Sequence, residues 1–285
     1  MIPSVNFHLW EPCNMRCNFC FATFQDMKKT ILPKGHLPKE QSLEVVRSLA
    51  DAGFEKITFV GGEPTLCPWL IDLIREANLL GMNTGIVTNG SKLSAEYLSE
   101  LRPWLDWIGI SIDSLQHDTN IPIGRAIYGK RPLDKEHYYN LVDLVNQFGF
   151  QLKINTVVNS RNLSEDLNDF IRYSKTSRWK VFQVLPIKGE NDRYIEDLKI
   201  SSEEFDSFLE RHKGLGNILV PERNEDMTGS YAMVDPAGRF FENSTGSLLY
   251  SQPILEVGVL AAYEQAHPDS EKFLKRGGLY DWNKA

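Results

Sequence analysis

Three cysteines stand close together near the start of the chain. Cys13, Cys17 and Cys20 form a C-x3-C-x2-C motif directly after a β-like run. Structural zinc sites usually use two CxxC-like pairs or added histidines, and no fourth ligand lies near these thiols in the sequence. Three cysteines can instead hold an iron–sulfur cluster that leaves one iron open for a substrate or cofactor. Cysteines this dense are seldom accidental, so a chance group of buried thiols is the weaker interpretation.

Small and polar residues follow the next β-like runs. Gly61-Gly62-Glu63-Pro64 comes after the second run, where two glycines let the backbone approach a ligand closely and Glu63 could accept a hydrogen bond from an amine. A tight turn is the alternative interpretation of this motif. Asn89 follows the third run and Ser111 ends the fourth, although Ser111 could equally be a helix cap or a strand-end serine.

Cationic residues recur on the later strand-like runs. Side chains alternate faces with period 2 in a strand, so Lys153 and Asn155 share one face, as do Arg178 and Lys180. Unpaired charges inside a barrel are costly, so this set indicates a polyanionic ligand such as a triphosphate. Lys56 and Arg125 could join it. Lysines on the outer surface paired with helix acids are the alternative for any single residue.

The elements that must position these residues alternate between strand and helix. The expected strands are Ser4–Leu9, Lys56–Val60, Asn83–Val87, Trp107–Ile112, Gln151–Val157 and Lys180–Leu185. The expected helices are Lys39–Ala52, Trp69–Leu80, Ala95–Leu101, Lys135–Phe148, Ser164–Tyr173 and Ser202–His212, with Ser164 and Ser201 at N-caps. This alternation predicts an α/β fold with parallel strands, as an open doubly wound sheet or a partial barrel. Function would lie at the carboxyl ends of the strands.

Length and charge restrict the alternatives. The chain has 285 residues, 42% of them hydrophobic, and we expect a barrel over 1–214 with a C-terminal extension over 215–285 that covers the open mouth. The net charge of -7 argues against a nucleic-acid polymer as partner. No apolar run approaches the ~18 residues of a membrane span. Four cysteines are too few for a disulfide framework, which favours a reducing cytoplasm.

The cysteine motif, with the aromatic Phe19 before its third cysteine, resembles the radical S-adenosylmethionine (SAM) superfamily. The resemblance implies a partial (β/α)6 barrel and a [4Fe–4S] cluster whose open iron chelates SAM. Reductive cleavage of SAM then gives methionine and a 5′-deoxyadenosyl radical. The resemblance also implies that several residues bind the cofactor, and that those at the strand ends lie near the amino and carboxylate groups of SAM. The residues concerned are Phe19, Gly61, Gly62, Glu63, Asn89, Ser111 and Arg125.

Further segments, from residue 6 almost to the end, resemble the viperin family. They are Asn6-Phe7-His8, Cys17-Asn-Phe-Cys20-Phe21, Ile123-Gly124-Arg125, Lys153-Ile-Asn155, Asn162-Leu-Ser-Glu165-Asp166, Arg178-Trp-Lys180-Val-Phe-Gln183, Gly189-Glu-Asn191, Val220-Pro-Glu222 and Phe273-Leu-Lys-Arg-Gly-Gly278. The resemblance implies dehydration of CTP, UTP or GTP to the 3′-deoxy-3′,4′-didehydro analogue, a chain terminator for viral polymerases. The 5′-deoxyadenosyl radical takes the ribose 4′ hydrogen, the 3′ hydroxyl leaves, and one electron and a proton transfer complete the alkene.

The same resemblance implies a role for each site residue. Lys56, Lys153, Arg178 and Lys180 would hold the triphosphate, while Asn6 and Asn155 place the nucleotide and Arg125 lies near the SAM carboxylate or a phosphate. Tyr231 matches a viperin tyrosine near the substrate and is the candidate catalytic residue, with a packed core aromatic as the alternative. We expect an external one-electron reductant and a monomer.

Three departures from animal viperins bear on specificity and origin. The chain starts at the barrel, without the amphipathic membrane helix, and stops at Asn283-Lys-Ala285, without the acidic tail and terminal tryptophan used for cluster delivery. Both suit a bacterial or archaeal member. Gly246-Ser-Leu248-Leu-Tyr250 replaces a basic patch over the substrate, which leaves the preferred base open.

Two other functions stay open. The first is a single-cluster radical SAM enzyme acting on another phosphorylated small molecule or a peptide. The second is a non-catalytic metal- or nucleotide-binding module.

Overall fold

A single sheet organises the chain in the computed structural model, which describes residues 1–282 apart from the side chains of Lys28 and Lys29. Its ten strands run in the order β12-β11-β10-β1-β2-β3-β4-β7-β8-β9. The six strands expected from the sequence form its middle as β1 (Ser4–Trp10), β2 (Lys56–Gly61), β3 (Asn83–Thr88), β4 (Trp107–Ser111), β7 (Gln151–Val158) and β8 (Arg178–Gln183). Neighbours among these six pair in parallel, so the predicted α/β fold is confirmed.

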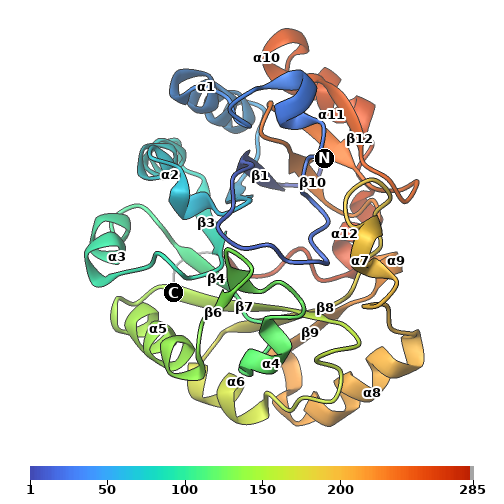
Figure 1. Ribbon diagram of the computed structural model, residues 1–285. Coiled ribbons are helices and arrows are strands. Elements are labelled where there is room, and N and C mark those ends of the chain that lie inside the picture. Colours follow the sequence, from blue (N-terminus) through green and yellow to red (C-terminus); the bar gives the residue numbers. More distant parts are fainter. Residues whose placement is uncertain (283–285) are drawn as a thin grey trace.

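Helices wrap the outside of the curved sheet, as Figure 1 shows for α1, α2, α3, α5 and α6. The helices of residues 1–214 are α1 (Lys39–Asp51), α2 (Leu70–Leu79), α3 (Ala95–Leu101), α4 (His117–Asn120), α5 (Lys135–Gln147), α6 (Asn168–Ser174), α7 (Asp192–Ile195) and α8 (Ser202–His212). Short 3-10 or π-helical turns lie at Met27–Ile31, Pro64–Leu66 and Lys213–Ile218, and a small hairpin joins β5 (Ala126–Ile127) to β6 (Arg131–Pro132).

The side chains of β7 alternate between the two faces of the sheet, and this alternation explains why the concave face is polar. Leu152, Ile154, Thr156 and Val158 are buried on the face toward the helices, where α5 presents residues such as Leu141 and Val145. The intervening residues, Lys153 and Asn155 among them, therefore face the inside of the curved sheet. One hydrophobic core thus lies between the sheet and the helices, and the concave face stays free for polar side chains.

One expected helix begins later than the sequence suggests. We predicted a helix from Ser164, but α6 begins at Asn168. Glu165, expected in the first turn, instead accepts hydrogen bonds from Ser114 Oγ at 2.8 Å and Thr119 Oγ1 at 2.6 Å, which hold this segment as a loop. The prediction for α8 is confirmed, since Ser201 and Glu204 form a reciprocal capping box at its start.

The segment after residue 214 adds strands to the main sheet, in addition to covering the cavity that we expected it to cover. It contributes β9 (Leu219–Glu222), which pairs in parallel with β8, and β10 (Ala232–Val234), which pairs in parallel with β1 at the opposite edge. It continues through β11 (Arg239–Glu242), β12 (Leu249–Pro253), α9 (Asn224–Met227), α10 (Ile254–Val257), α11 (Val259–Ala266) and α12 (Ser270–Lys275). The proposed division into 1–214 and 215–285 therefore separates two stretches of chain that share one sheet and one core. Asn283-Lys-Ala285 lies outside the described residues.

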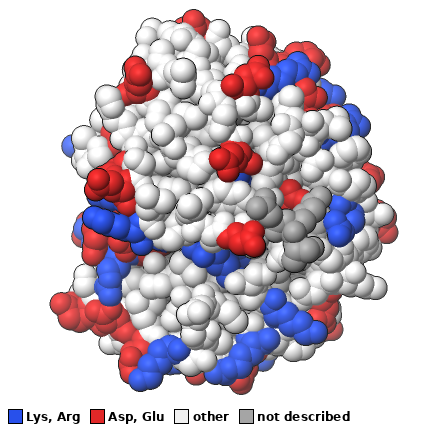
Figure 2. All heavy atoms as spheres, turned by 180° about the vertical axis from the view of Figure 1, so that it is seen from behind, with Lys and Arg blue, Asp and Glu red and all other residues white. Residues whose placement is uncertain are grey.

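The surface and the helices bear on possible partners. On the face shown in Figure 2, Lys and Arg side chains are interspersed with Asp and Glu, without a continuous basic stripe among the described residues. No helix within residues 1–282 is long and apolar enough to cross a membrane.

Candidate active site

A cavity of about 770 Å³ occupies the concave face of the sheet. This volume lies within the range of small-molecule sites. It is lined by every site residue predicted from the sequence: Asn6, Cys13, Cys17, Phe19, Cys20, Lys56, Gly61, Gly62, Glu63, Asn89, Ser111, Arg125, Lys153, Asn155, Arg178, Lys180 and Tyr231. The cysteines lie at the rim made by the carboxyl ends of the strands, and the lysines come from nearer the amino ends. We call these two regions the cysteine rim and the cationic floor.

The cysteine rim is built on the loop after β1. Arg16 N donates to Gly124 O at 3.1 Å, and Asn18 N donates to Ile123 O at 2.9 Å. Gly124 has a φ of 75°, and a Cβ there would lie 1.9 Å from Arg16 O, so only glycine allows this contact. The Ile123-Gly124 segment of the sequence motif therefore supports the loop that carries Cys17.

The three thiols fit an iron–sulfur cluster better than a single ion. Burial raises the pKa of Cys13 and Cys20 to about 11 and that of Cys17 to about 12, so the thiols stay protonated until a metal displaces their protons. Within residues 1–282 no three His, Cys, Asp or Glu side chains converge on a point suited to one metal ion. A cube-shaped cluster is larger, and three free thiols that line one cavity match its needs.

The two glycines after β2 bring two parts of the rim together. A Cβ on Gly61 would lie 2.4 Å from Trp10 O, and one on Gly62 would lie 2.1 Å from Glu11 O. We expected these glycines to admit a ligand, and in the structure their close approach is to the segment that leads into Cys13. Their small size therefore sets the position of the cysteine loop against the end of β2.

Glu63 joins the ends of β2 and β3. Its side chain is 1% exposed, and its Oε2 accepts from Asn89 N at 2.7 Å while its Oε1 accepts from Thr88 Oγ1 at 2.6 Å. Burial raises the pKa of Glu63, and these hydrogen bonds oppose that shift. Asn89 Nδ2 in turn donates to Asn14 Oδ1 in the cysteine loop at 2.8 Å. The carboxylate and amide are thus held at the rim, and Oε2 retains capacity to accept from an amine.

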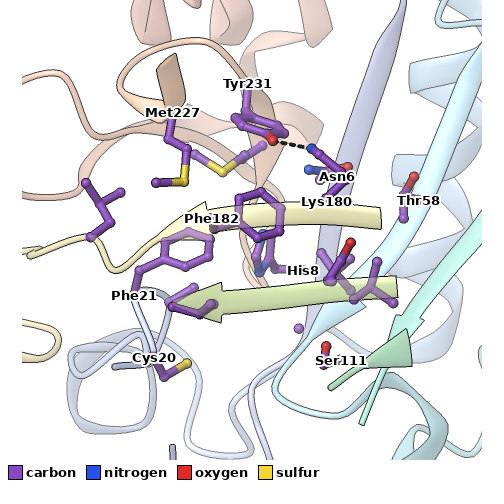
Figure 3. A pocket seen from close by; sticks show the side chains of 18 of the residues that line it. Asn6, His8, Cys20, Phe21, Thr58, Ser111, Lys180, Phe182, Met227 and Tyr231 are labelled. Atoms are coloured by element: carbon purple, nitrogen blue, oxygen red, sulfur yellow. Dashed lines mark hydrogen bonds between the residues drawn. The ribbon is translucent and has the colours of Figure 1, made fainter. Parts of the chain in front are cut away.

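Arg125 lies at the cysteine rim, away from the cationic floor. Its Nε donates to Asp113 Oδ2 at 2.6 Å, and its guanidinium lies 5.5 Å from the ring centre of Phe19. Asp113, 1% exposed, also accepts from Val157 N at 2.7 Å. The structure therefore groups Arg125 and Phe19 with the cysteines. Ser111, at the end of β4, points into the cavity in Figure 3.

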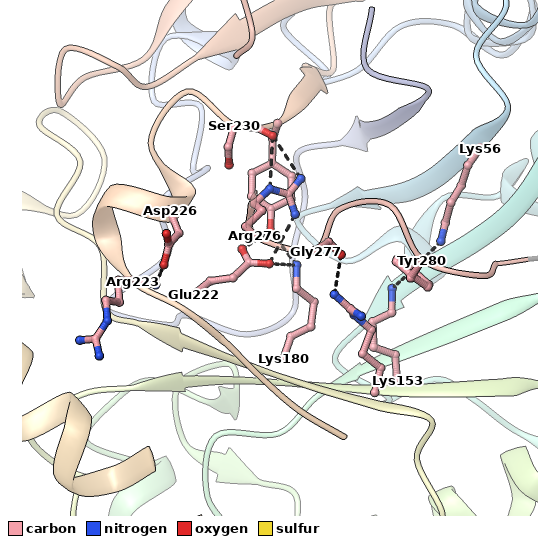
Figure 4. Close-up of polar contacts among 12 residues, drawn as sticks. Lys56, Lys153, Lys180, Glu222, Arg223, Asp226, Ser230, Arg276, Gly277 and Tyr280 are labelled. Atoms are coloured by element: carbon pink, nitrogen blue, oxygen red, sulfur yellow. Dashed lines mark hydrogen bonds and ion pairs between the residues drawn. The ribbon is translucent and has the colours of Figure 1, made fainter. Parts of the chain in front are cut away.

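The cationic floor is closed by the C-terminal tail. Tyr280 Oη accepts from Lys153 Nζ at 2.8 Å and also from Lys56 Nζ, and Arg178 Nη2 donates to Gly277 O at 2.7 Å (Figure 4). Burial and the neighbouring cations lower the pKa of Lys56 to about 5 and that of Lys153 to about 7. In the absence of an anion these two lysines are therefore poorly charged.

A buried carboxylate sits among the other floor cations. Glu222, 0% exposed, contacts Lys180 Nζ at 2.5 Å and Arg276 Nη1 at 3.4 Å through its Oε1. Its Oε2 accepts from Tyr231 Oη, and Lys180 Nζ donates to that same hydroxyl at 2.7 Å. The cations hold the pKa of Glu222 below its usual range, whereas burial and the carboxylate raise that of Tyr231. Tyr231 is therefore a protonated hydroxyl held between an amine and a carboxylate.

Polar atoms without partners mark the middle of the cavity. Asn155 Oδ1 and Arg178 Nε are buried in the cavity wall and make no hydrogen bond among the described residues. Asn6 lines the same wall from β1. Buried polar groups are rarely left unpaired in proteins, so these atoms are suited to a bound polar ligand.

One wall of the cavity near the cysteines is apolar. His8 lies edge-on to Phe21, Phe24 and Phe241, with ring centres 5.2 to 6.0 Å apart, and burial lowers its pKa to about 3 (Figure 3 shows His8 and Phe21). The ring of His8 is therefore neutral at physiological pH. Leu248, in the segment Gly246 to Tyr250, packs against the cluster that contains Phe24 and Phe241.

The sequence alone missed four contributors to the site: Glu190, Glu222, Arg276 and Tyr280. Glu190, Glu222 and Arg276 lie in motifs that resemble the viperin family, but neither composition nor spacing indicated what they contact. Glu190 Oε2 accepts from Thr23 N, Thr23 Oγ1 and Phe24 N at 2.6 to 2.8 Å, and so fastens the chain just after Cys20.

Comparison with known proteins identifies the family of the chain. Residues 10–199 match the model of the radical SAM superfamily. The chain is 60% identical over 282 residues to an S-adenosylmethionine-dependent nucleotide dehydratase of Lacinutrix mariniflava, covering 99% of this chain and 59% of that protein. It is 57% identical to a protein of the same name from Flammeovirga pacifica, covering 99% and 97%. It is 38% identical to S-adenosylmethionine-dependent nucleotide dehydratase RSAD2 of Oncorhynchus mykiss, covering 99% and 81%.

Solved structures share the fold at low sequence identity. The native anSMEcpe structure with bound AdoMet and the Kp18Cys peptide has a TM-score of 0.70 at 15% identity, covering 98% of this chain and 84% of that one. Streptococcus suis SuiB bound to S-adenosylmethionine has a TM-score of 0.63 at 17% identity, covering 83% and 59%. These likenesses support the fold, and the relatives that match 99% of this chain support the family. The chain belongs to the radical SAM superfamily and, within it, to the family of S-adenosylmethionine-dependent nucleotide dehydratases that includes RSAD2.

Proposed function

We propose that the protein removes water from a ribonucleoside triphosphate (CTP, UTP or GTP) to give the 3′-deoxy-3′,4′-didehydro nucleotide. One observation carries the proposal: a single cavity has a rim of three cysteines and a floor of buried cations, and its wall includes unpartnered polar atoms of Asn155 and Arg178. A nucleotide whose triphosphate lies on the floor would present its ribose to the rim. The name of the Flammeovirga pacifica relative, which is matched over 97% of its length, supports the same substrate class.

The cysteine rim would hold the cofactors of the superfamily. Cys13, Cys17 and Cys20 would ligate the [4Fe–4S] cluster, and Glu63 and Ser111 would bind the amino and carboxylate groups of SAM, with Phe19, Gly61, Gly62, Asn89 and Arg125 shaping that site. When bound, these cofactors supply an organic radical able to take a hydrogen atom from the ribose. The carboxylate of Glu63 has one oxygen with spare acceptor capacity, and the side-chain hydroxyl of Ser111 makes no hydrogen bond among the described residues, so both suit these partners.

Tyr231 would act on the departing 3′ hydroxyl. That group leaves readily only as water, so it needs a proton at its oxygen. The hydroxyl of Tyr231 is protonated, and Lys180 donates to it at 2.7 Å. A proton given up by Tyr231 could therefore be replaced from Lys180, whose charge Glu222 balances at 2.5 Å.

The remaining features concern the setting of the reaction. We infer an external one-electron reductant, since the chain offers only Cys67 beyond the three rim cysteines and so has too few thiols for a second cluster. We also infer a monomer in a reducing cytoplasm, where the free thiols would persist. The product, which lacks a 3′ hydroxyl, would terminate chain extension by viral polymerases and so serve antiviral defence.

The test is an anaerobic panel of nucleotides. The cluster is reconstituted, SAM and dithionite are added, and CTP, UTP, GTP and ATP are offered separately with mass detection. We expect at least one of CTP, UTP and GTP to raise 5′-deoxyadenosine formation and to yield a product lighter by one water. If none does either, the proposal is wrong. Lys130→Met, in the exposed hairpin between β5 and β6, is a matched control that should behave as the wild type.

A further inference from the structure

Five cationic side chains line the floor of the cavity: Lys56, Lys153, Arg178, Lys180 and Arg276. Three of them are almost fully buried, with exposed fractions of 3% for Lys56 and 9% for Lys180 and Arg276. Arg178 and Lys153 are directly paired across β7 and β8, so the charges stand on adjacent strands. Concentrated positive charge of this kind is costly without an anion.

Among the described residues no carboxylate lines this part of the cavity, and Glu222 contacts two of the floor cations from outside the lining. Glu222 is fully buried, and both of its oxygens are engaged, one by Lys180 and Arg276 and the other by Tyr231 (Figure 4). A carboxylate held in this way has no oxygen directed at a metal ion. Glu222 therefore balances one floor cation and positions Tyr231.

The carboxylates that line the cavity lie toward the cysteine rim. Glu11 follows β1 at its carboxyl end. Both oxygens of Glu63 are bonded at the ends of β2 and β3, and Asp113 is paired with Arg125. Asp106 lies before the amino end of β4, outside the cavity lining, and its Oδ2 accepts from Thr84. A Mg²⁺ ion bridging phosphates is usually held by one or two carboxylates, and the described floor does not offer that set.

The floor charge matches a bare triphosphate. Five cations and one carboxylate give a formal charge of +4 when all are ionised. A free nucleoside triphosphate carries a charge of about -4 near neutral pH, since its terminal phosphate has a second pKa near 6. Mg²⁺ would reduce that charge to about -2 and leave roughly two buried cations without an anion, which is unfavourable.

We propose that this site binds the nucleoside triphosphate free of Mg²⁺, so that Mg²⁺ in solution withdraws substrate from the protein. The floor cations then neutralise the phosphate charge that Mg²⁺ partly neutralises at other triphosphate sites. The inference rests on the proposed function and narrows its substrate to the metal-free form. Protonation of the poorly charged Lys56 and Lys153 on binding completes the match of charge.

The experiment is a binding titration without turnover. Cluster-loaded protein with SAM but no reductant is titrated with CTP, UTP and GTP in EDTA, then at Mg²⁺ levels that complex about nine-tenths of the nucleotide. Because only the free form binds, the apparent Kd of any nucleotide that binds should rise about tenfold. KCl matched for ionic strength controls for screening. An apparent Kd that is unchanged or lower with Mg²⁺ overturns the inference.

Inorganic tripolyphosphate separates this inference from the proposed function. If none of the three nucleotides binds, the proposed function fails. The tripolyphosphate titration then tests by itself whether the cationic floor is a polyanion site. If tripolyphosphate binds in EDTA and Mg²⁺ weakens this binding, the result supports a metal-free polyanion site. If tripolyphosphate does not bind, the inference is overturned. Two variants sharpen the result. Lys153→Met lowers the formal charge to +3 and should reduce the Mg²⁺ effect on the apparent Kd below tenfold, whereas Glu222→Gln raises the charge to +5 and should keep the full tenfold effect.

Discussion

Nucleotide binding should be coupled to proton uptake by the floor lysines. Without an anion, burial and neighbouring cations lower the pKa of Lys56 to about 5 and that of Lys153 to about 7. Both lysines donate a hydrogen bond to the hydroxyl of Tyr280, which is a neutral partner. A triphosphate favours their charged forms and should return both pKa values toward the ordinary value near 10.4.

The magnitude follows from those values. At pH 8 Lys56 is almost entirely neutral and Lys153 is about nine-tenths neutral before binding, so binding should take up about two protons. At pH 6 only Lys56 is still mostly neutral, and uptake should fall to about one, less the proton that the terminal phosphate gives up. Burial lowers the pKa of Lys180 to about 7 although Glu222, at 2.5 Å, opposes that shift, so protons taken up by Lys180 add to these numbers.

The sign of the pH dependence is fixed by the same reasoning. The bound state holds more protons than the free state, so affinity rises as pH falls and is lost as pH rises from about 7 toward 10. Near pH 8 the association constant should fall by at least about a hundredfold per pH unit, since Lys56 and Lys153 alone take up about two protons.

The assay is calorimetry at pH 8 in buffers that differ in ionisation enthalpy. The slope of the observed enthalpy against the buffer enthalpy gives the number of protons taken up. Lys56→Met should lower that number by about one, and the exposed Lys130→Met should leave it unchanged. No buffer dependence for the wild type would refute the reasoning.

Four further predictions concern single residues. Cys17→Ala should abolish the cluster absorbance near ~410 nm, while Cys67→Ala, at a buried thiol outside the cavity lining, should keep it; loss in both would contradict the three-cysteine assignment. Tyr231→Phe should keep 5′-deoxyadenosine formation but lower nucleotide product by about 10²-fold or more, and an unchanged product ratio would remove the tyrosine from the mechanism. Glu190→Ala should lower the free energy of unfolding, measured in urea, by about 1–3 kcal/mol and should lower the yield of nucleotide product per 5′-deoxyadenosine formed. Glu190→Gln should restore most of the stability and most of the yield. Equal behaviour of the two variants would argue against a role of the hydrogen bonds that Glu190 accepts. Asp113→Asn should cost about 3–5 kcal/mol in the same assay because Arg125 is left buried without its partner, and a cost below 1 kcal/mol would contradict a structural ion pair.

Local pattern was sufficient for much of the fold. The six central strands lie within a few residues of their predicted positions because their alternation and their flanking helices are short-range features. The same period of 2 placed Lys153 and Asn155 together on the inner face. The start of α6 was wrong because a contact between Glu165 and Ser114, 51 residues apart, competes with the local capping signal.

The parts of the site that could not be predicted depend on contacts across the whole chain. Tyr280 meets Lys56 across 224 residues and Lys153 across 127, and no periodic pattern encodes such a contact. Arg276 likewise reaches Glu222 across 54 residues. The glycines after β2 were recognised as a close approach, but their partner, the segment before Cys13, is visible only in three dimensions.

The central claim is that one cavity presents the ribose of a floor-bound nucleotide to the cofactors at the cysteine rim. Transfer of deuterium from a nucleotide labelled at the ribose 4′ carbon tests it most directly. With the nucleotide that is turned over, we predict that deuterium appears in 5′-deoxyadenosine in step with the dehydrated product. Unlabelled 5′-deoxyadenosine, with all deuterium retained in the nucleotide, would contradict the account.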